Sequence, residues 1–312
     1  MPTSASFDYD VLIVGGGPAG LSAALTLGRA RRRVLVCDAG DARNAPAAHA
    51  HGLLTRDGTP PLELRRLGRA ELDRYGVEVR DVRIAALERT TGGYCATTAR
   101  GRSVTARTVI LATGVVDELL PIPGVAEGWG VSVVHCPYCH GYELADRPTG
   151  VVGRGDGTYA QARLLRAWTD DLTVLTNGPE DLSPAQEASL SAYAIKVDRR
   201  AIERFDVDAR GQVRSVVFED GAETPLGAVY VRPPQSAGAP FAQDLGADCT
   251  PEGVKVDADG RTGVPGLFVV GDAAVLDVGD IHTVQNLAYA LHSGVRAGMG
   301  VVFDLVAGGS IV

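Results

Sequence analysis

The side chains best placed for covalent chemistry are two cysteines, Cys136 and Cys139, in the segment His135-Cys-Pro-Tyr-Cys-His140. A two-residue spacer keeps the sulfur atoms close enough for a reversible disulfide, and a nearby imidazolium stabilises a thiolate. Three alternatives stay open: a zinc site, the first helix of a thioredoxin fold, and a pair of unreactive structural thiols. Zinc usually requires a second such pair, whereas the next cysteine, Cys249, is distant and single. We therefore favour a redox pair and predict no metal site.

Composition argues against several classes of partner. The 312 residues include 30 basic and 38 acidic side chains, a net charge of −8, which argues against binding nucleic acid through a basic patch. No apolar run is long enough to cross a bilayer, and the N-terminus lacks the basic and apolar parts of a signal peptide. The 5 cysteines, an odd number, do not suit a disulfide scaffold. We expect a soluble, cytoplasmic protein without a nucleic-acid or membrane partner.

A glycine-rich turn follows the first apolar strand and has the G-x-G-x-x-G spacing. The first glycine permits a tight turn, the second lets the backbone approach a pyrophosphate, and the third lets helix pack on sheet. An acidic residue ends the next apolar strand, where an acid binds ribose hydroxyl groups. Strand, turn, helix and acid together predict a dinucleotide site. Its predicted residues are Gly15, Gly17, Pro18, Ala19, Gly20 and Asp38.

Strand-like and helix-like segments alternate along the chain, and the pattern starts twice. The first start has a strand over 10–15, and the second has a strand over 150–153 followed by a helix over 156–168. A final strand over 266–270 leads to a helix over 283–305. Two such starts predict an α/β fold with two doubly wound, Rossmann-like units.

Two short motifs extend this pattern to a known family. Thr113-Gly114 follows a buried strand, and Gly271-Asp272 follows the final strand. With the glycine turn they resemble, in order, the fingerprints of flavoproteins that have two dinucleotide-binding domains. Since the cysteine pair lies between the two units, the chain resembles the low-molecular-weight thioredoxin reductases over essentially its whole length.

The resemblance implies an FAD domain that is split by an inserted nicotinamide-type domain. We expect the first part of the FAD domain over 1–115 and its second part over 241–312. The inserted domain, which carries the cysteine pair, would cover 116–240. The resemblance further implies FAD as the cofactor and a homodimer as the assembly.

The resemblance also implies roles for single residues. Cys139 would face the flavin, and Cys136 would exchange with the substrate. His140 stands where the family has an acid–base aspartate, and a histidine, which titrates near neutral pH, can take a thiol proton. His135 is a second candidate for this role. Further cofactor contacts are implied for Thr113, Gly114, Gly271, Asp272, which would bond the ribityl chain, and Gln285, which opens the last helix.

The inserted domain departs from the family at its nucleotide site. Its turn over 153–158 keeps the glycine pattern but places a large charged residue, Arg154, between the first two glycines. In NADPH-using relatives an arginine-rich segment follows the next strand, because guanidinium groups clamp the 2′-phosphate. Here the segment 176–181 contains no Arg or Lys and ends in two acids. The sequence predicts that NADPH does not bind tightly, so that electrons enter from a dithiol.

These departures favour an oxidase. The chain resembles the thioredoxin reductase-like dithiol oxidases that close the disulfide of natural products of the holomycin and gliotoxin type. A small-molecule dithiol would be oxidised by the Cys136–Cys139 disulfide, and the electrons would pass through FAD to O2, giving H2O2. One alternative is an NAD(P)H-dependent thioredoxin or disulfide reductase. Another, of a different class, is a flavin-binding redox sensor without turnover.

Overall fold

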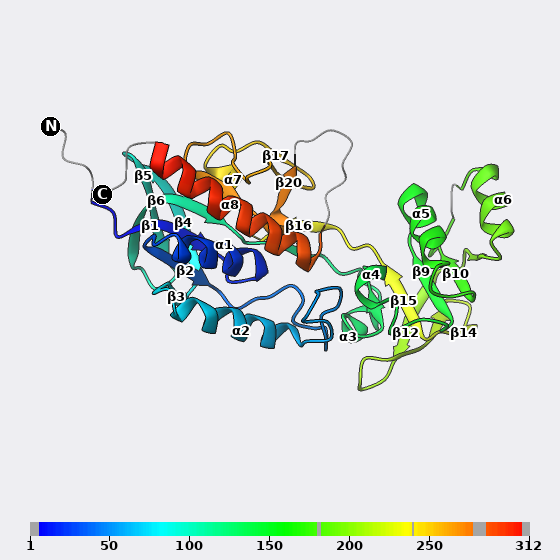
Figure 1. Cartoon of the computed structure of the whole chain (residues 1–312). Coiled ribbons are helices and arrows are strands. Elements are labelled where there is room, and N and C mark those ends of the chain that lie inside the picture. The colour runs from blue at the N-terminus through cyan, green and yellow to red at the C-terminus, as the bar shows by residue number, and fades with distance from the viewer. Residues whose placement is uncertain (1–5, 180–181, 239, 277–284, 308–312) are drawn as a thin grey trace. The chain divides into compact units, whose positions relative to one another are not determined.

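The structure, a computed structural model, describes residues 6–307 apart from 180–181, 239 and 277–284 (Figure 1). The chain divides into two compact units. Unit 1 comprises Met1–Ala45, Pro61–Val116 and Gln235–Val312, and unit 2 comprises Pro46–Pro60 and Asp117–Pro234. Each unit is built on a sheet with parallel strands and has helices, which confirms the predicted α/β class.

Unit 1 is built around a sheet with the strand order β3-β2-β1-β6-β5-β4, in which β19 also pairs with β6. The strand pairs β3–β2, β2–β1, β1–β6 and β6–β19 are parallel, whereas β4, β5 and β6 form an antiparallel meander. Apolar side chains cover both faces of the sheet, as parallel strands require. The strands are β1 Tyr9–Val14, β2 Val34–Asp38, β3 Glu78–Asp81, β4 Ile84–Thr90, β5 Gly93–Thr98, β6 Ser103–Leu111 and β19 Leu267–Val269.

Two long helices of unit 1 lie side by side, α1 (Pro18–Arg29) and α8 (Leu287–Ala307) (Figure 1). They approach closely because Gly294 has no side chain. A Cβ atom there would lie less than 3.0 Å from the Ala19 carbonyl oxygen, which real Cβ atoms essentially never do. The other elements of unit 1 are α2 Pro61–Asp73, β7 Val115–Asp117, β16 Gln235–Ala237, α7 Phe241–Asp244, β17 Cys249–Thr250, β18 Gly253–Val256, the 3₁₀ helix η1 Gly271–Ala273 and β20 Ala274–Leu276.

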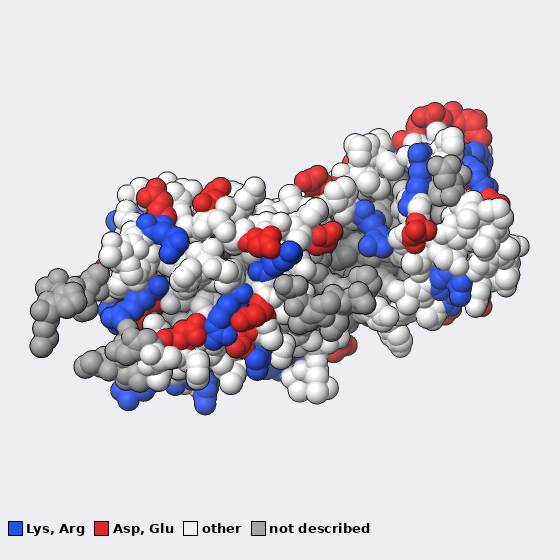
Figure 2. Space-filling model, turned by 90° about the horizontal axis from the view of Figure 1, so that it is seen from above, with Lys and Arg blue, Asp and Glu red and all other residues white. Residues whose placement is uncertain are grey.

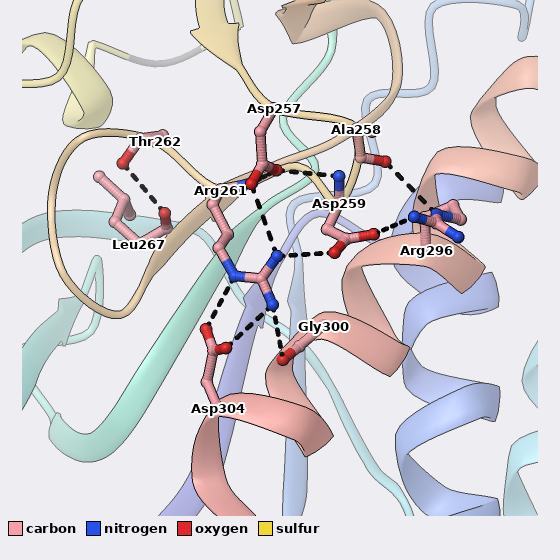
Figure 3. A network of polar contacts seen from close by, with 9 residues as sticks. All are labelled: Asp257, Ala258, Asp259, Arg261, Thr262, Leu267, Arg296, Gly300 and Asp304. Carbon is pink, nitrogen blue, oxygen red and sulfur yellow. Dashed lines mark hydrogen bonds and ion pairs between the residues drawn. The ribbon is translucent and has the colours of Figure 1, made fainter. Parts of the chain in front are cut away.

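Arg261 ties the second half of α8 to the loop that follows β18. Its Nε and Nη2 bond the carboxylate of Asp304 at 3.0 and 2.9 Å, and its Nη1 lies 2.7 Å from Asp259 (Figure 3). Asp259 also pairs with Arg296, which lies on the same helix. Ion pairs as well as apolar packing therefore hold α8, the helix that follows Gln285.

Unit 2 has a five-stranded parallel sheet with the order β11-β10-β9-β15-β8. A second, antiparallel sheet has the order β12-β13-β14. The strands are β8 Val133–Val134, β9 Thr149–Val152, β10 Leu172–Leu175, β11 Lys196–Asp198, β12 Ile202–Val207, β13 Val213–Phe218, β14 Glu223–Pro225 and β15 Ala228–Val231. The helices are α3 Val125–Gly128, α4 Pro137–His140, α5 Gly155–Leu165 and α6 Pro184–Ala192.

Three predicted segments differ from the structure in their extent. The helix expected over 156–168 is α5, which ends at Leu165. The last helix, expected from residue 283, is α8 from Leu287 onward, and its expected start at 283–284 lies outside the described residues. The 46–60 segment, which the sequence places with the first part of the FAD domain, belongs to unit 2 by its contacts.

Acidic and basic side chains are intermixed on the surface. On the face of unit 1 drawn in Figure 2, basic and acidic side chains lie beside one another. The ion pairs of this unit include Arg261 with Asp304 and Arg83 with Asp41. Within the described part of the chain, no helix is long and apolar enough to cross a membrane.

Candidate functional site

The glycine turn between β1 and α1 leaves a space open at the start of a helix. Gly15 has a φ of 110°, which L side chains rarely adopt. A Cβ at Gly20 would come closer than 3.0 Å to the Gly15 carbonyl oxygen, so only glycine lets α1 pack on the turn. Gly17, the N-cap of α1, has no described atom within 4 Å of its Cβ position. The free N–H groups of the helix, which begins at Pro18, therefore border a space that suits a pyrophosphate.

Asp38 ends β2 beside this turn, and 6% of it is exposed. One carboxylate oxygen accepts the Gly40 N–H at 3.1 Å, and the other is shared by Arg65 and by Arg69, the latter at 2.6 Å. Burial alone would raise the pKa of Asp38, but the Gly40 N–H and the two guanidinium groups hold this pKa below its usual value. The carboxylate is therefore ionised at neutral pH and fixed where it can accept ribose hydroxyl groups.

A second polar group in unit 1 joins residues that the resemblance assigned to the cofactor. Arg43 Nη1 lies 2.8 Å from Asp272 Oδ2 and 3.0 Å from Gln285 Oε1. Gln285 Nε2 in turn lies 3.0 Å from Gln235 Oε1. The structure thus brings Asp272 and Gln285 together through Arg43, and the sequence pattern predicted neither Arg43 nor Gln235.

The remaining predicted cofactor residues follow neighbouring strands of the same sheet. Thr113 and Gly114 come after β6, and Gly271 comes after β19, the parallel neighbour of β6. The carboxyl ends of parallel strands meet at one edge of a sheet, which is where such folds bind dinucleotides. The open space at Gly17, the ionised Asp38 and this strand edge fit a dinucleotide such as FAD.

The cysteine pair lies in unit 2 and is joined in a disulfide, with the two Cα atoms 5.3 Å apart. Cys136 is the N-cap of the short helix α4, and Cys139 lies about one helical turn further on, next to Cys136. Between them, Tyr138 is 72% exposed and lies edge-on to Trp168 at 5.5 Å between ring centroids. Among the described residues, no group of three or more His, Cys, Asp or Glu could hold a metal ion. The geometry agrees with thiol–disulfide exchange.

His140 ends α4 directly after Cys139, and both of its ring nitrogens are buried. Neither nitrogen has a hydrogen-bond partner among the residues that the structure describes. Burial lowers the pKa of His140 below 6.5; the charge of Glu143 opposes this shift, whereas that of His51 adds to it. The ring is therefore neutral at neutral pH, which is the form that accepts a proton.

His135, the other predicted base, has different surroundings. Its ring stacks on Trp129 with 5.7 Å between the centroids and 25° between the planes. Its carbonyl oxygen accepts a hydrogen bond from Gln161 Nε2 at 2.9 Å. The stacking on Trp129 orients the ring, and the role of His135 in proton transfer stays a prediction.

A third histidine, His51 of the 46–60 segment, contacts Glu143, which follows α4. His51 Nε2 lies 3.4 Å from Glu143 Oε1, and His51 Nδ1 lies 3.5 Å from Asp57 Oδ2. The Gly52 N–H donates to Asp57 at 2.8 Å and, with His51, lowers the pKa of that carboxyl. The sequence pattern did not predict this group, because it joins two segments that are distant in the chain.

At the corresponding turn of unit 2, two arginine side chains bond nearby backbone carbonyls. Arg154, the N-cap of α5, donates from Nε to the Thr176 carbonyl at 2.8 Å and from Nη2 to the Asn177 carbonyl. Arg232 Nη1 lies over the first turn of α5, 3.3 Å from the Gly157 carbonyl oxygen. Arg154 therefore reaches the end of β10 and Arg232 the first turn of α5, whereas the Cβ position of Gly155, the counterpart of Gly17, has no described atom within 4 Å.

One expectation at this turn is wrong in part. The sequence predicted no cation at the end of β10, whereas the structure places the guanidinium group of Arg154 there. This cation belongs to another segment, so the local sequence could not indicate it, and its donors bond backbone carbonyls. The two acids expected in this loop, Glu180 and Asp181, lie outside the described residues.

Comparison with known proteins places the chain in a family. A family profile described as pyridine nucleotide-disulphide oxidoreductase matches residues 9–294. The chain belongs to this family. It is therefore an oxidoreductase of the flavoprotein type, and the α/β fold with two Rossmann-like units is that of its thioredoxin reductase relatives.

Several relatives match over nearly the whole chain. The "Thioredoxin reductase tcpT" of Claviceps purpurea (strain 20.1) is 34% identical over 97% of this chain and 96% of its own. The crystal structure of HlmI is 35% identical, covers 96% of this chain and 93% of that one, and has a TM-score of 0.86. A putative thioredoxin reductase TrxB from Bacillus anthracis is 29% identical, with a TM-score of 0.89 and coverage of 96% and 99%. The predicted resemblance to thioredoxin reductases is confirmed.

Proposed function

We propose that this cytoplasmic oxidoreductase is an FAD-dependent dithiol oxidase. Its substrate is a small-molecule dithiol, its oxidant is O2, and its products are an intramolecular disulfide and H2O2. It acts as a homodimer in the biosynthesis of, or self-protection against, a disulfide-containing natural product. The observation that carries the proposal is the contrast between a redox disulfide, Cys136–Cys139, and a second nucleotide turn at which Arg154 occupies the end of the next strand.

The residues of unit 1 suit FAD. The N–H groups at the start of α1 would hold the pyrophosphate beside Gly17, and Asp38 would accept the ribose hydroxyl groups. Asp272 and Gln285, joined by Arg43, would bind the ribityl chain and the ring. Bound FAD supplies the acceptor for the electron pair of the reduced cysteines, and O2 takes that pair as H2O2.

The chemistry of the chain itself is a double thiol–disulfide exchange. A substrate thiolate attacks Sγ of Cys136, the Cys136–Cys139 bond breaks, and Cys139 leaves as a thiolate. The second substrate thiolate then attacks the mixed disulfide, so that the substrate disulfide closes and Cys136 is released. Two electrons and two protons have then left the substrate. The neutral His140 ring, which follows Cys139, takes a proton in this exchange.

The second nucleotide turn supports the direction of electron flow. Arg154 and Arg232 border the second glycine turn, and Nε and Nη2 of Arg154 are already bonded to the Thr176 and Asn177 carbonyls. To bind NADPH, the chain would have to break these bonds and move a side chain. A hydride donor is therefore disfavoured, and a dithiol is the source of electrons.

The anaerobic half-reaction of the purified, FAD-loaded protein tests the proposal. Dithiothreitol should bleach the yellow flavin absorbance within seconds, whereas NADPH should leave it unchanged over minutes. With O2 and the dithiol, the protein should then produce H2O2. Cys136→Ser and Cys139→Ser variants serve as matched controls, and both should lose dithiol-dependent bleaching and peroxide.

Two results would overturn the proposal. The thioredoxin reductase names of the relatives favour a second candidate, an NAD(P)H-dependent disulfide reductase. Rapid bleaching by NADPH, followed by reduction of a disulfide substrate, would establish that candidate. If neither NADPH nor a panel of dithiols bleaches the flavin, both enzymatic candidates fail, and the remaining alternative is a flavin-binding redox sensor without turnover.

A further inference from the structure

Two aromatic side chains lie beside the disulfide of unit 2. Tyr138 stands between Cys136 and Cys139 in α4 and is 72% exposed. Its ring meets that of Trp168 edge to face, with 5.5 Å between the centroids and 87° between the planes. In such a pair one ring covers at most one face of the other, so at least one face of the Tyr138 ring is left uncovered by Trp168. The helical turn that carries the disulfide therefore presents an aromatic surface.

Trp168 is held in place by the turn that follows the disulfide. Its indole lies against the backbone of Gly141, where a Cβ atom would come within 2.8 Å of Trp168 Nε1. The Trp168 carbonyl oxygen accepts the Asp146 N–H at 3.0 Å, and the ring packs against the apolar core cluster that contains Leu165. Backbone and core contacts thus fix the indole, which in turn orients the ring of Tyr138.

A substrate that attacks Cys136 comes within reach of Tyr138. Cys136 is the half-buried N-cap of α4, and Tyr138 follows two residues later. On a helix, residues at this spacing have Cα atoms about 5 Å apart. A tyrosine side chain is longer than this separation, so its ring can contact the scaffold that carries the attacking thiolate.

We propose that Tyr138, oriented by Trp168, is a specificity-determining residue that binds an aromatic ring of the substrate. The inference rests on the proposed function and deepens it, because it specifies a dithiol whose thiol groups are attached beside an aromatic ring. Two aromatic rings in contact gain energy beyond the burial of their apolar surface, which an aliphatic scaffold does not. The thiol–disulfide exchange at Cys136 is unchanged, and no bond forms to Tyr138.

The experiment compares two dithiols that close the same six-membered disulfide ring, ortho-bis(mercaptomethyl)benzene and its cis-cyclohexane counterpart. Anaerobic flavin bleaching is followed over a range of concentrations of each, and the two half-saturating concentrations give a ratio for every variant. Comparing this ratio between variants cancels the intrinsic reactivity of the dithiols. We expect Tyr138→Leu to reduce the preference for the benzene dithiol about fivefold. The maximal bleaching rate should stay within about twofold of the wild type, and Tyr138→Phe should keep the preference.

Two further variants serve as controls. Trp168→Leu leaves the segment from Cys136 to Cys139 intact and removes the ring that orients Tyr138, so the preference should fall about twofold. This variant tests the inference even where a change at Tyr138 itself disturbs the disulfide turn. Tyr193, which is 46% exposed and lies elsewhere in unit 2, is the matched tyrosine, and Tyr193→Ala should keep the wild-type ratio.

The outcomes separate this inference from the proposed function. If both dithiols bleach the flavin and Tyr138→Leu keeps the wild-type ratio, the aromatic contact is refuted while dithiol oxidation stands. An equal loss in Tyr138→Phe would also refute it, because the hydroxyl group and not the ring would then bind the substrate. A loss in Tyr193→Ala would show that the effect is not specific to the disulfide turn. If neither dithiol bleaches the wild-type flavin, the proposed function fails and this inference fails with it.

Discussion

The two strand–turn–helix starts of this protein share a backbone register and differ in the side chains at the turn and at the end of the second strand. In unit 1, Val14 pairs with Cys37, so Asp38 stands directly beyond the end of β1. In unit 2, Val152 pairs with Leu175, so Thr176 takes the place of Asp38. Gly16 follows the first glycine of the first turn, and Arg154 follows the first glycine of the second.

This difference decides what occupies the end of the second strand. Gly16 has no side chain, and a Cβ there would come closer than 3.0 Å to the Asp38 carboxylate. Arg154 instead crosses its turn and bonds the Thr176 carbonyl at 2.8 Å. The end of the second strand thus carries a carboxylate in unit 1 and the guanidinium group of Arg154 in unit 2. The residue between the first two glycines decides which of the two groups can lie there.

The largest expected effect tests whether the first turn needs its third glycine. In Gly20→Ala the new methyl group would press on the Gly15 carbonyl oxygen, so α1 must move away from β1. We expect a loss of about 2 to 3 kcal/mol in the free energy of unfolding, and less than about a tenth of the wild-type FAD content. Thermal melts and the flavin-to-protein absorbance ratio measure both. Gly17→Ala, whose methyl group meets no described atom within 4 Å, should keep the apoprotein's stability and lose only FAD affinity.

The second effect concerns the side chain that distinguishes the two turns. Gly16→Ala should displace the Asp38 carboxylate and raise the FAD dissociation constant at least about tenfold, which corresponds to about 1.4 kcal/mol. Fluorescence titration of the apoprotein with FAD measures this constant. An unchanged constant would break the comparison, because the contact between Gly16 and Asp38 would then not matter for binding.

The third effect should depend on pH. Asp38→Asn removes the charge that Arg65 and Arg69 share, and we expect a loss of about 2 kcal/mol in the unfolding free energy of the apoprotein at pH 7, the size of a hydrogen bond to a charged group. The folded-state pKa of Asp38 is lowered, so its contribution is complete above about pH 4 and is lost as pH falls through that pKa. Urea melts from pH 7 to pH 3 should therefore show the two proteins converging in acid. A difference that stays constant with pH would contradict the ion-pair account.

The smallest effect concerns the second turn. Arg154→Gly loses hydrogen bonds to two carbonyl groups, which we expect to cost about 1 kcal/mol of unfolding free energy. FAD content and the dithiol half-reaction should stay within about twofold of the wild type. Because the end of β10 is opened, ADP-ribose should bind to the variant in the millimolar range, measurable by calorimetry, and not to the wild type. Equal binding to both proteins would show that Arg154 does not obstruct the site.

Local patterns predicted the elements of the candidate site. The turn over Gly15–Gly20, the acid at Asp38 and the disulfide spacing of Cys136 and Cys139 each depend on a few consecutive residues and on the neighbouring strand. The strand edges at Gly114 and Gly271 were found from the resemblance, because their motifs are too short to be specific. The catalytic role of His140 stays a prediction, now with a buried, neutral ring in its support.

The sequence could not predict contacts between segments that are distant in the chain. Arg65 and Arg69 lie on a helix that no local signal places beside Asp38, and Arg43 reaches Asp272 across most of the chain. The contact of His51 with Glu143 arose in the same way, as did the contact between Arg154 and the end of β10.

The sequence by itself determined the fold class, the two nucleotide-type turns and the disulfide-forming cysteine pair, because backbone conformation and sulfur spacing are local properties. The tertiary structure alone decided which charged side chains contact Asp38, and that the side chain of Arg154 lies at the end of β10. Such pairings depend on which helices and loops pack together, and that packing is set by the apolar cores of the two units rather than by the charged residues themselves.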